Sequence, residues 1–230
     1  MEQVTEARQI TGGVSDFGRA RALLAPLLST APLVCLSEPA PPPTVTSPRL
    51  YAFDCGTLVN NKSEDYGQKR EEVKNSNMGV TCYLVVHPKG MLIYDTGLND
   101  RLVGRPLFET VVRGYGQIKF NTLRGQLADI GLTPARIEYL VLSHYHWDHI
   151  GNAGDFAGST WLVYKGDRDQ MFNSAARAYA WFGQYSALEH SKTTLLSGDH
   201  GAFGDGTVVV IATPGHSEGH CCGEAERSCG

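Results

Sequence analysis

The sequence lacks a surplus of positive charge. Its 230 residues contain 20 Lys and Arg against 24 Asp and Glu, which gives a formal net charge of −4. Because a nucleic-acid backbone demands concentrated positive charge, this balance argues against nucleic acid as substrate or partner. With 42% hydrophobic residues and 26 glycines, the composition is otherwise ordinary for a soluble α/β protein.

Cysteine is scarce and scattered. The six cysteines lie at positions 35, 55, 82, 221, 222 and 229, without any Cys-x-x-Cys spacing. The spacing therefore indicates neither a disulfide framework nor a zinc knuckle. We expect Cys55 and Cys82 to be free buried thiols.

Long apolar runs are also missing. The strongest candidate, residues 22–36, is too short and too interrupted by proline to span a membrane. It follows Arg19 and Arg21 and precedes a proline-rich linker at residues 37–43, an arrangement that resembles a secretory signal peptide. We therefore expect residues 1–48 to be an N-terminal extension and the protein to be periplasmic or secreted. The alternative is a cytoplasmic protein with a disordered arm.

The chemistry-bearing residues concentrate in residues 143–152, which read Ser-His-Tyr-His-Trp-Asp-His-Ile-Gly-Asn. An apolar run at residues 139–142 precedes them and predicts a short buried strand. His144 and His146 are two positions apart, so in extended backbone they point the same way and can bind one ion.

Two further ligands follow in the same loop. Asp148 and His149 come where the chain must turn, and can face a second ion beside the first. Imidazole and carboxylate groups suit zinc, and also iron or manganese. The pattern therefore predicts a metal site with one or two ions.

Two other strand ends deliver polar residues. Thr-Pro-Gly-His, ending at His216, follows a predicted strand at 207–212, and Asp95-Thr96-Gly97 ends a predicted strand that begins at residue 91. A rigid strand that releases such side chains at its end is a common way to build a site.

The wording of residues 143–152 resembles the signature of the metallo-β-lactamase superfamily, in particular its lactonase-like branch, which includes N-acyl-homoserine lactonases. The likeness covers about residues 49–220. It implies an α/β fold of the four-layered αββα sandwich type with a one- or two-metal hydrolytic centre. It also implies that His216 joins the first ion and that Asp95 orients the metal histidines without binding the metal.

The resemblance further implies a zinc-dependent hydrolase that opens a small-molecule lactone or related ester through a metal-bound water. Asp148 would bind the second ion or orient the attacking water, and Ser143 is interpreted as a loop residue rather than a nucleophile. Two alternatives remain: an iron-dependent redox enzyme of the same fold, and a truncated, non-catalytic fragment. The sequence does not indicate an oligomeric state.

The resemblance breaks after His220. Residues 221–230 contain three cysteines and show neither a strand nor a helix period. The family's further strands, bridging aspartate and last ligand histidine do not follow. From this we expect the hydrolase domain, 49–230, to be incomplete after about residue 220, lacking part of its C-terminal half through a shifted reading frame. Unpaired sheet edges would then make the chain marginally stable.

The remaining sequence patterns predict strands and a helix outside the metal site. We expect strands at 49–56, 81–87, 91–97 and 160–164, two strands after Ser191, and an amphipathic helix at 120–130. His87 and His220 are interpreted as structural, and His190 and His200 as solvated loop residues. The aromatic residues of segment 166–189 either shape an apolar pocket or fill the core.

Overall fold

The protein is described by a computed structural model that covers residues 43–59 and 61–225. The signal-like segment at 22–36, most of the proline-rich linker and the last five residues lie outside this description. Within the described residues, no helix is both long and apolar enough to cross a membrane.

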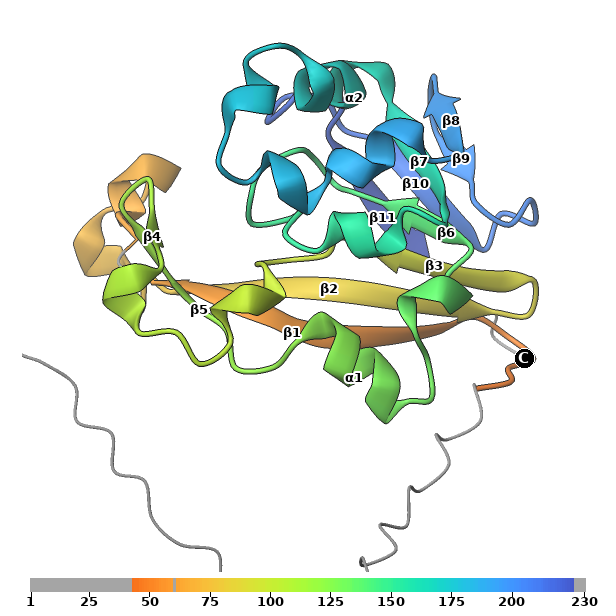
Figure 1. Ribbon diagram of the computed structural model, residues 1–230, viewed down its shortest axis with the longest axis horizontal. Coiled ribbons are helices and arrows are strands. Elements are labelled where there is room, and N and C mark those ends of the chain that lie inside the picture. The colour runs from red at the N-terminus through yellow and green to blue at the C-terminus, as the bar shows by residue number, and fades with distance from the viewer. Residues whose placement is uncertain (1–42, 60, 226–230) are drawn as a thin grey trace, which may run out of the picture. The chain divides into compact units, whose positions relative to one another are not determined.

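An eight-stranded sheet dominates the structure (Figure 1), in the order β4-β5-β1-β2-β3-β6-β7-β8. Strands β3, β6, β7 and β8 run parallel to their neighbours in that series, and the other pairs are antiparallel. The strands are β1 (Arg49–Val59), β2 (Met78–His87), β3 (Gly90–Tyr94), β4 (Val111–Val112), β5 (Tyr115–Ile118), β6 (Tyr139–Val141), β7 (Thr160–Tyr164) and β8 (Thr193–Leu196).

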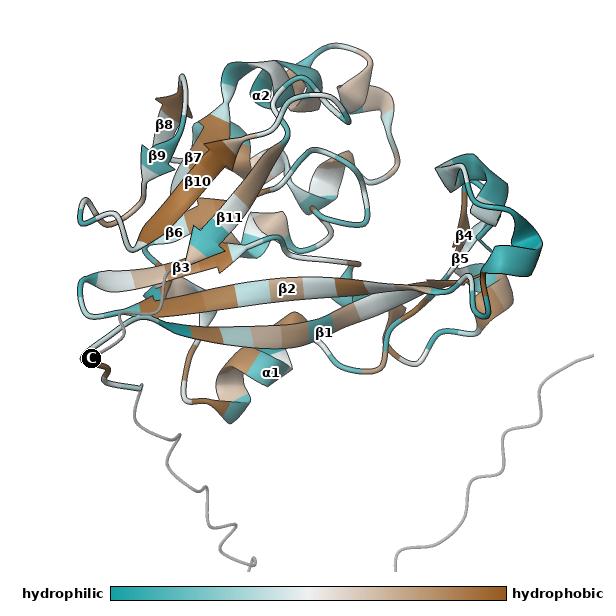
Figure 2. Ribbon diagram, turned by 180° about the vertical axis from the view of Figure 1, so that it is seen from behind, coloured by the Kyte–Doolittle hydropathy of each residue, from teal (hydrophilic) through white to brown (hydrophobic). Residues whose placement is uncertain are grey.

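A second sheet of three antiparallel strands packs against the first. It consists of β9 (His200–Gly201), β10 (Val208–Ala212) and β11 (Cys221–Ala225), with β10 in the middle. One apolar core joins Val85, Leu92 and Leu162 of the large sheet to Val208 and Val210 of the small one. Figure 2 shows the apolar character of β10 beside the large sheet. The predicted α/β class and its packed sheets are therefore confirmed.

The helices are short. Helix α1 (Leu123–Asp129) lies beside β1 (Figure 1) and buries Leu123 and Leu127, as its spacing predicts. The second α-helix is α2 (Lys165–Phe172). The 3-10 turns are Ser63–Tyr66, Arg70–Glu72, Asp100–Leu102, Leu107–Glu109, Pro134–Arg136, Ala153–Phe156, Ala176–Ala178, Phe182–Gln184 and Ser186–His190.

The expectation that Cys55 and Cys82 are free thiols is wrong, because they form a disulfide with a Cα–Cα distance of 5.8 Å. The cause is the pairing of β1 with β2. Residue Phe53 lies opposite Cys82, and the register shifts just after Asp54. This irregularity brings the next cysteine alongside Cys82, although 27 positions separate the two in sequence.

Two further expectations require correction. Residues 221–225 form strand β11, although their side chains show no strand period, because their backbone pairs with β10 from Cys221 to Ala225. His200 lies half-buried in β9, opposite Val210, and not in a loop. His87 is structural, as expected: its ring stacks on Phe203 at 4.2 Å and its Nε2 lies 3.1 Å from Asp205.

Candidate metal centre

Sheet topology explains why distant sequence segments meet. Strands β3 and β6 are parallel neighbours, with Tyr94 opposite Val141. Their carboxyl ends therefore open at the same edge of the sheet, and the chain leaves them into Asp95 and into residues 143–149. The small sheet contacts the same edge, because Cys221 N, at the start of β11, donates to Ser143 O at 2.9 Å.

Three histidines converge at this edge. His144 Nε2 lies 3.0 Å from His146 Nδ1, and His216 Nε2 lies 3.2 Å and 3.0 Å from these two atoms. His144 is buried, His146 half-buried and His216 exposed, so the cluster runs from the interior to solvent. Among the described residues, this trio forms a group whose nitrogens could hold a metal ion.

The geometry fits zinc. Two nitrogens bound tetrahedrally at about 2.0–2.1 Å from zinc lie roughly 3.3 Å apart, close to the separations of 3.0–3.2 Å found here. Three imidazole nitrogens facing one point cannot all be satisfied by hydrogen bonds to each other, because each neutral ring offers one donor and one acceptor. A shared cation resolves that conflict.

The protonation state of two of the three histidines favours metal binding. Burial lowers the pKa of His144 well below its usual range, and the neighbouring histidines act in the same direction. Burial and His216 also lower the pKa of His146, against the opposing effect of Asp148. Neutral imidazoles are the ligand form, so His144 and His146 can accept an ion without first losing protons.

Asp95 supports the histidine cluster through hydrogen bonds. Its carboxylate accepts from Ser143 N at 2.7 Å and from Ser143 Oγ at 2.8 Å, and contacts His149 Nδ1 at 2.8 Å. Ser143 Oγ in turn lies 3.0 Å from His144 Nδ1. Asp95 thus contacts one ring directly and a second through Ser143. The sequence interpretation treated Ser143 only as a loop residue and missed this bridge.

Asp148 and His149 lie beside the trio and outside it. Asp148 Oδ2 lies 3.5 Å from His149 Nε2. Burial lowers the pKa of His149, but hydrogen bonds to Asp148 and Asp95 outweigh it and raise that pKa to about 10. Burial raises the pKa of Asp148, but His149 outweighs it and leaves the carboxyl below its usual range. A metal at His149 would therefore have to displace a proton.

Two glycines allow the supporting loops to touch. A Cβ on Gly151 would lie 2.5 Å from Gly97 O, and a Cβ on Gly97 would collide with Cys55. The close approach permits hydrogen bonds from Gly151 N to Gly97 O at 2.8 Å and from Leu98 N to Cys55 O at 3.1 Å. Asn152 adds a side-chain bond to Leu98 O at 2.8 Å. Residues 97 and 98 therefore link the metal loop, residues 143–152, to strand β1, which carries Cys55.

A buried aspartate anchors the loop that carries His216. Asp167, on α2, accepts from Ser217 Oγ at 3.0 Å and from Gly219 N at 2.7 Å. Nothing in its sequence context distinguished Asp167 from the exposed Asp169 of the same helix. His220 contacts Thr213 Oγ1 through Nδ1 at 2.9 Å, a contact within the same loop.

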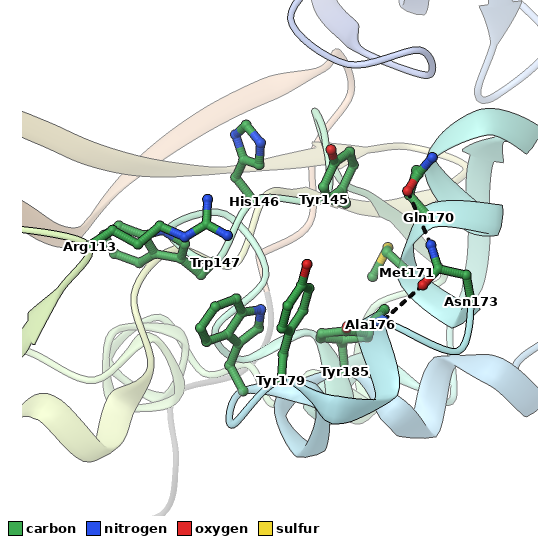
Figure 3. A pocket seen from close by; sticks show the side chains of 11 residues that line it. Arg113, Tyr145, His146, Trp147, Gln170, Met171, Asn173, Ala176, Tyr179 and Tyr185 are labelled. Atoms are coloured by element: carbon green, nitrogen blue, oxygen red, sulfur yellow. Dashed lines mark hydrogen bonds between the residues drawn. The ribbon is translucent and has the colours of Figure 1, made fainter. Parts of the chain in front are cut away.

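The trio opens into a cavity of about 350 Å³, which Asp148, Trp147, Tyr66 and Arg113 also line. A second cavity of about 120 Å³ adjoins it, and His146, Trp147 and Arg113 line both. Figure 3 shows His146 and Trp147 beside Tyr145 and Tyr179 in this second space. Both interpretations of the aromatic residues in segment 166–189 therefore apply in part: Tyr179 and Trp181 line this cavity, whereas Phe172 and Phe182 pack on the core.

Comparison with known proteins bears on the family. The profile described as Metallo-beta-lactamase superfamily matches residues 76–228, about two thirds of the chain. The chain belongs to the metallo-β-lactamase superfamily. The match spans both histidine motifs and Asp95, so the resemblance predicted from residues 143–152 is confirmed.

Curated relatives point in one direction. The chain is 29% identical over 193 residues to the N-acyl homoserine lactonase AttM of Agrobacterium fabrum, covering 76% of this chain and 70% of that protein. It is also 29% identical over 181 residues to the N-acyl homoserine lactonase AiiA of Bacillus thuringiensis subsp. kurstaki, covering 76% and 69%.

Solved structures share the fold. An N-acyl homoserine lactone hydrolase with N-hexanoyl-L-homoserine at its catalytic metal centre matches with a TM-score of 0.60 and 21% identity, covering 80% of this chain and 72% of that one. AidC, a dizinc quorum-quenching lactonase with bound product, matches with a TM-score of 0.57 and 18% identity, covering 79% and 68%. At these identities the likeness supports the fold alone.

Proposed function

We propose that this protein is a zinc-dependent hydrolase that opens lactones of the N-acyl homoserine type, and thereby quenches quorum signals. The observation that carries the proposal is the convergence of three imidazole nitrogens within 3.2 Å of one another at the wall of an open cavity. The names of the curated relatives supply the substrate class.

The residues proposed to hold the ion are His144, His146 and His216, a three-histidine set that leaves a position open. When bound there, zinc supplies Lewis acidity, which polarises a carbonyl and lowers the pKa of a water. Asp148 and His149 are the residues proposed for a second ion, which iron or manganese could also occupy on ligand chemistry alone.

The proposed catalytic residue is Asp148. Its pKa is held below the usual range, so the group is a carboxylate at neutral pH. It lines the same cavity as the histidines, where it can accept a hydrogen bond from the attacking water and fix that water's orientation. Asp95 and Ser143 are proposed as positioning residues that hold the rings of His144 and His149.

The test is lactone opening. Purified protein loaded with zinc should release acid from N-hexanoyl-homoserine lactone, measured by titration at constant pH. His146→Ala and His216→Ala should each lose about a hundredfold or more, because removing a ligand displaces the reacting groups. His190→Ala, an exposed histidine outside the site, is the matched control and should match wild type. A wild type that opens no lactone would overturn the substrate assignment.

We also propose export to the periplasm or the medium. The Cys55–Cys82 disulfide supports this proposal, because structural disulfides persist in oxidising compartments and are rare in the cytosol. The signal-like segment at 22–36 is the sequence feature behind it. Fractionation of cells that express the protein with a C-terminal tag tests it. A wholly cytoplasmic, unprocessed product would contradict export.

A further inference from the structure

The smaller cavity beside the metal centre contains one positive charge and no negative one. Of its lining side chains, Arg113 is the only one that belongs to a Lys, Arg, Asp or Glu residue. The lining also includes the polar side chains of Tyr145, His146, Gln170, Asn173, Tyr179 and Tyr185. Figure 3 shows Arg113 and Tyr179 reaching into this space from different sides. Because hydroxyl and amide N–H groups donate hydrogen bonds, this lining is suited to a negatively charged group.

The larger cavity, here called the metal cavity because the histidine trio lines it, differs in charge. The carboxylates of Asp65 and Asp148 line it as well. Neither of them lines the smaller cavity, whereas Arg113, His146 and Trp147 line both. A substrate whose reacting carbonyl lies at the trio can therefore extend a substituent past Arg113 into a space without carboxylates.

The backbone places Arg113 at this junction in a strained conformation. Val112 pairs with Tyr115, so Arg113 and Gly114 form a two-residue loop between β4 and β5. Both loop residues have a positive φ, 51° and 87°. Such loops favour Asn-Gly, since asparagine and glycine tolerate the left-handed region. An arginine does not improve this turn, and strained residues cluster at functional sites, so the contacts of its side chain explain its presence better.

The guanidinium of Arg113 is oriented by an aromatic ring and not by a carboxylate. Its Cζ lies 5.8 Å from the centre of the Trp181 ring, a contact that leaves the guanidinium N–H groups available to oxygen acceptors. Arg113 forms no ion pair with the described residues, whereas Arg105, Arg124 and Arg177 each form one. No carboxylate of the described chain therefore competes with a ligand for this guanidinium.

We propose that the smaller cavity is a subsite for a carboxylate at the end of a short acyl substituent, and that Arg113 pairs with this carboxylate. A guanidinium forms two parallel hydrogen bonds with a carboxylate, which a methyl terminus cannot accept. The cavity volume of about 120 Å³ is somewhat less than the roughly 150 Å³ that accommodates benzene, so about five heavy atoms fit, such as a carboxylate and two methylenes. This inference rests on the proposed lactonase function, because it takes the substrate to be an acylated homoserine lactone.

The experiment compares kcat/KM for homoserine lactones with and without a terminal carboxylate, in zinc-loaded protein. The pairs are glutaryl against pentanoyl and adipoyl against hexanoyl. Wild type should favour the carboxylate in at least one pair by about five- to tenfold, less than a buried charged hydrogen bond supplies, because Arg113 is exposed. For the same reason the preference should shrink as the salt concentration rises.

The decisive variant is Arg113→Asn, which removes the guanidinium and gives the loop its favoured Asn-Gly sequence. It should be at least as stable as wild type in urea and should lose the preference for the carboxylate. Arg136→Asn is the matched control, because Arg136 is exposed and lines neither cavity. It should keep the preference.

A second readout separates this inference from the lactonase proposal. Binding of glutaric acid monoamide and of pentanamide, which contain no lactone, is followed through the fluorescence of Trp147 and Trp181 in the cavity wall. Tighter binding of the monoamide by wild type, lost in Arg113→Asn, supports the inference even if no lactone is opened. A carboxylate preference that is absent from wild type, or equal in wild type and Arg113→Asn, would overturn it even if lactones are opened.

Discussion

At the scale of single residues, Asp95 combines an unusual backbone conformation with several contacts to the site. Its φ of 59° lies in the left-handed region, which a non-glycine residue occupies at a cost. The same residue contacts Ser143 twice and His149 once. Strained backbone residues cluster at functional sites. Here the strained conformation of Asp95 directs its carboxylate toward Ser143 and His149.

Asp95→Asn should therefore weaken zinc binding without unfolding the protein. Asparagine tolerates the left-handed region, but its amide group can accept on only one atom and loses the charge beside His149. We expect about a 10–100-fold rise in the zinc dissociation constant, measured by competition with a chromogenic chelator. Asp205→Asn, at the contact with His87 and outside the lining of the metal cavity, should leave this dissociation constant unchanged. Equal affinities in Asp95→Asn and wild type would contradict the role of Asp95.

Lys119 makes the stability depend on pH in a defined direction. Its side chain is fully buried, and its ammonium lies 2.9 Å from Asp100. Burial lowers the pKa of Lys119 from its usual 10.5, although Asp100 acts in the opposite direction. Between the lowered pKa and 10.5 the unfolded chain binds this proton more readily, so the free energy of unfolding rises with pH there.

Lys119→Met removes this titration and keeps most of the side-chain volume. As the pH rises toward 10.5, urea unfolding should show the free energy of unfolding of wild type rising relative to that of Lys119→Met. Lys89→Met, at a half-exposed lysine, is the control and should follow wild type. Parallel pH dependence of wild type and Lys119→Met would show that burial does not shift this lysine.

The residues also show what a sequence can and cannot indicate. The histidines were predictable because their type and spacing are rare outside metal sites, and the strand before them fixes their direction. Ser143 and Asp167 were not, since a serine or an aspartate becomes a support only through partners 48 to 52 positions away. Those partners are set by strand order, which local patterns do not contain.

At the scale of elements, the metal loop depends on the close packing of two backbones. Gly151→Ala should destabilise the protein by about 1–3 kcal/mol, because its Cβ would meet Gly97 O at 2.5 Å and the backbone cannot yield freely. Gly158→Ala is the matched control, with nothing within 4 Å of its Cβ. Urea unfolding measures both. A Gly151→Ala variant as stable as Gly158→Ala would contradict the packing of the two loops.

Elements were predictable where side chains alternate and not where only the backbone pairs. Strands β2, β3, β6 and β7 and helix α1 were expected from their apolar spacing, and the structure has them within a few residues. Strand β11 was missed, since four of its five residues are exposed and it is held through hydrogen bonds to β10.

At the scale of the whole molecule, the disulfide joins the paired strands β1 and β2. Replacing Cys55 and Cys82 together by Ala should lower the free energy of unfolding by about 3–4 kcal/mol, the chain-entropy value for a loop closed over this separation. Cys222→Ala, an exposed thiol, should have no effect. Urea unfolding under oxidising conditions measures the difference. Equal stability of the double variant and wild type would show that the bond does not form in solution.

The pairing of these cysteines could not be read from the sequence, because it depends on a register shift between two strands. The fold itself could be read from a resemblance concentrated in ten residues, since that motif implies the strand order around it. What a motif does not contain is how the rest of the chain packs around the site, such as the aromatic residues that line the smaller cavity.

The central claim is that His144, His146 and His216 together hold one zinc ion, and X-ray absorption at the zinc edge tests it most directly. The account predicts nitrogen or oxygen scatterers at about 2.0–2.1 Å with the outer-shell pattern of three imidazoles, reduced to two in His216→Ala. Sulfur scatterers at about 2.3 Å, or a spectrum unchanged in His216→Ala, would contradict it.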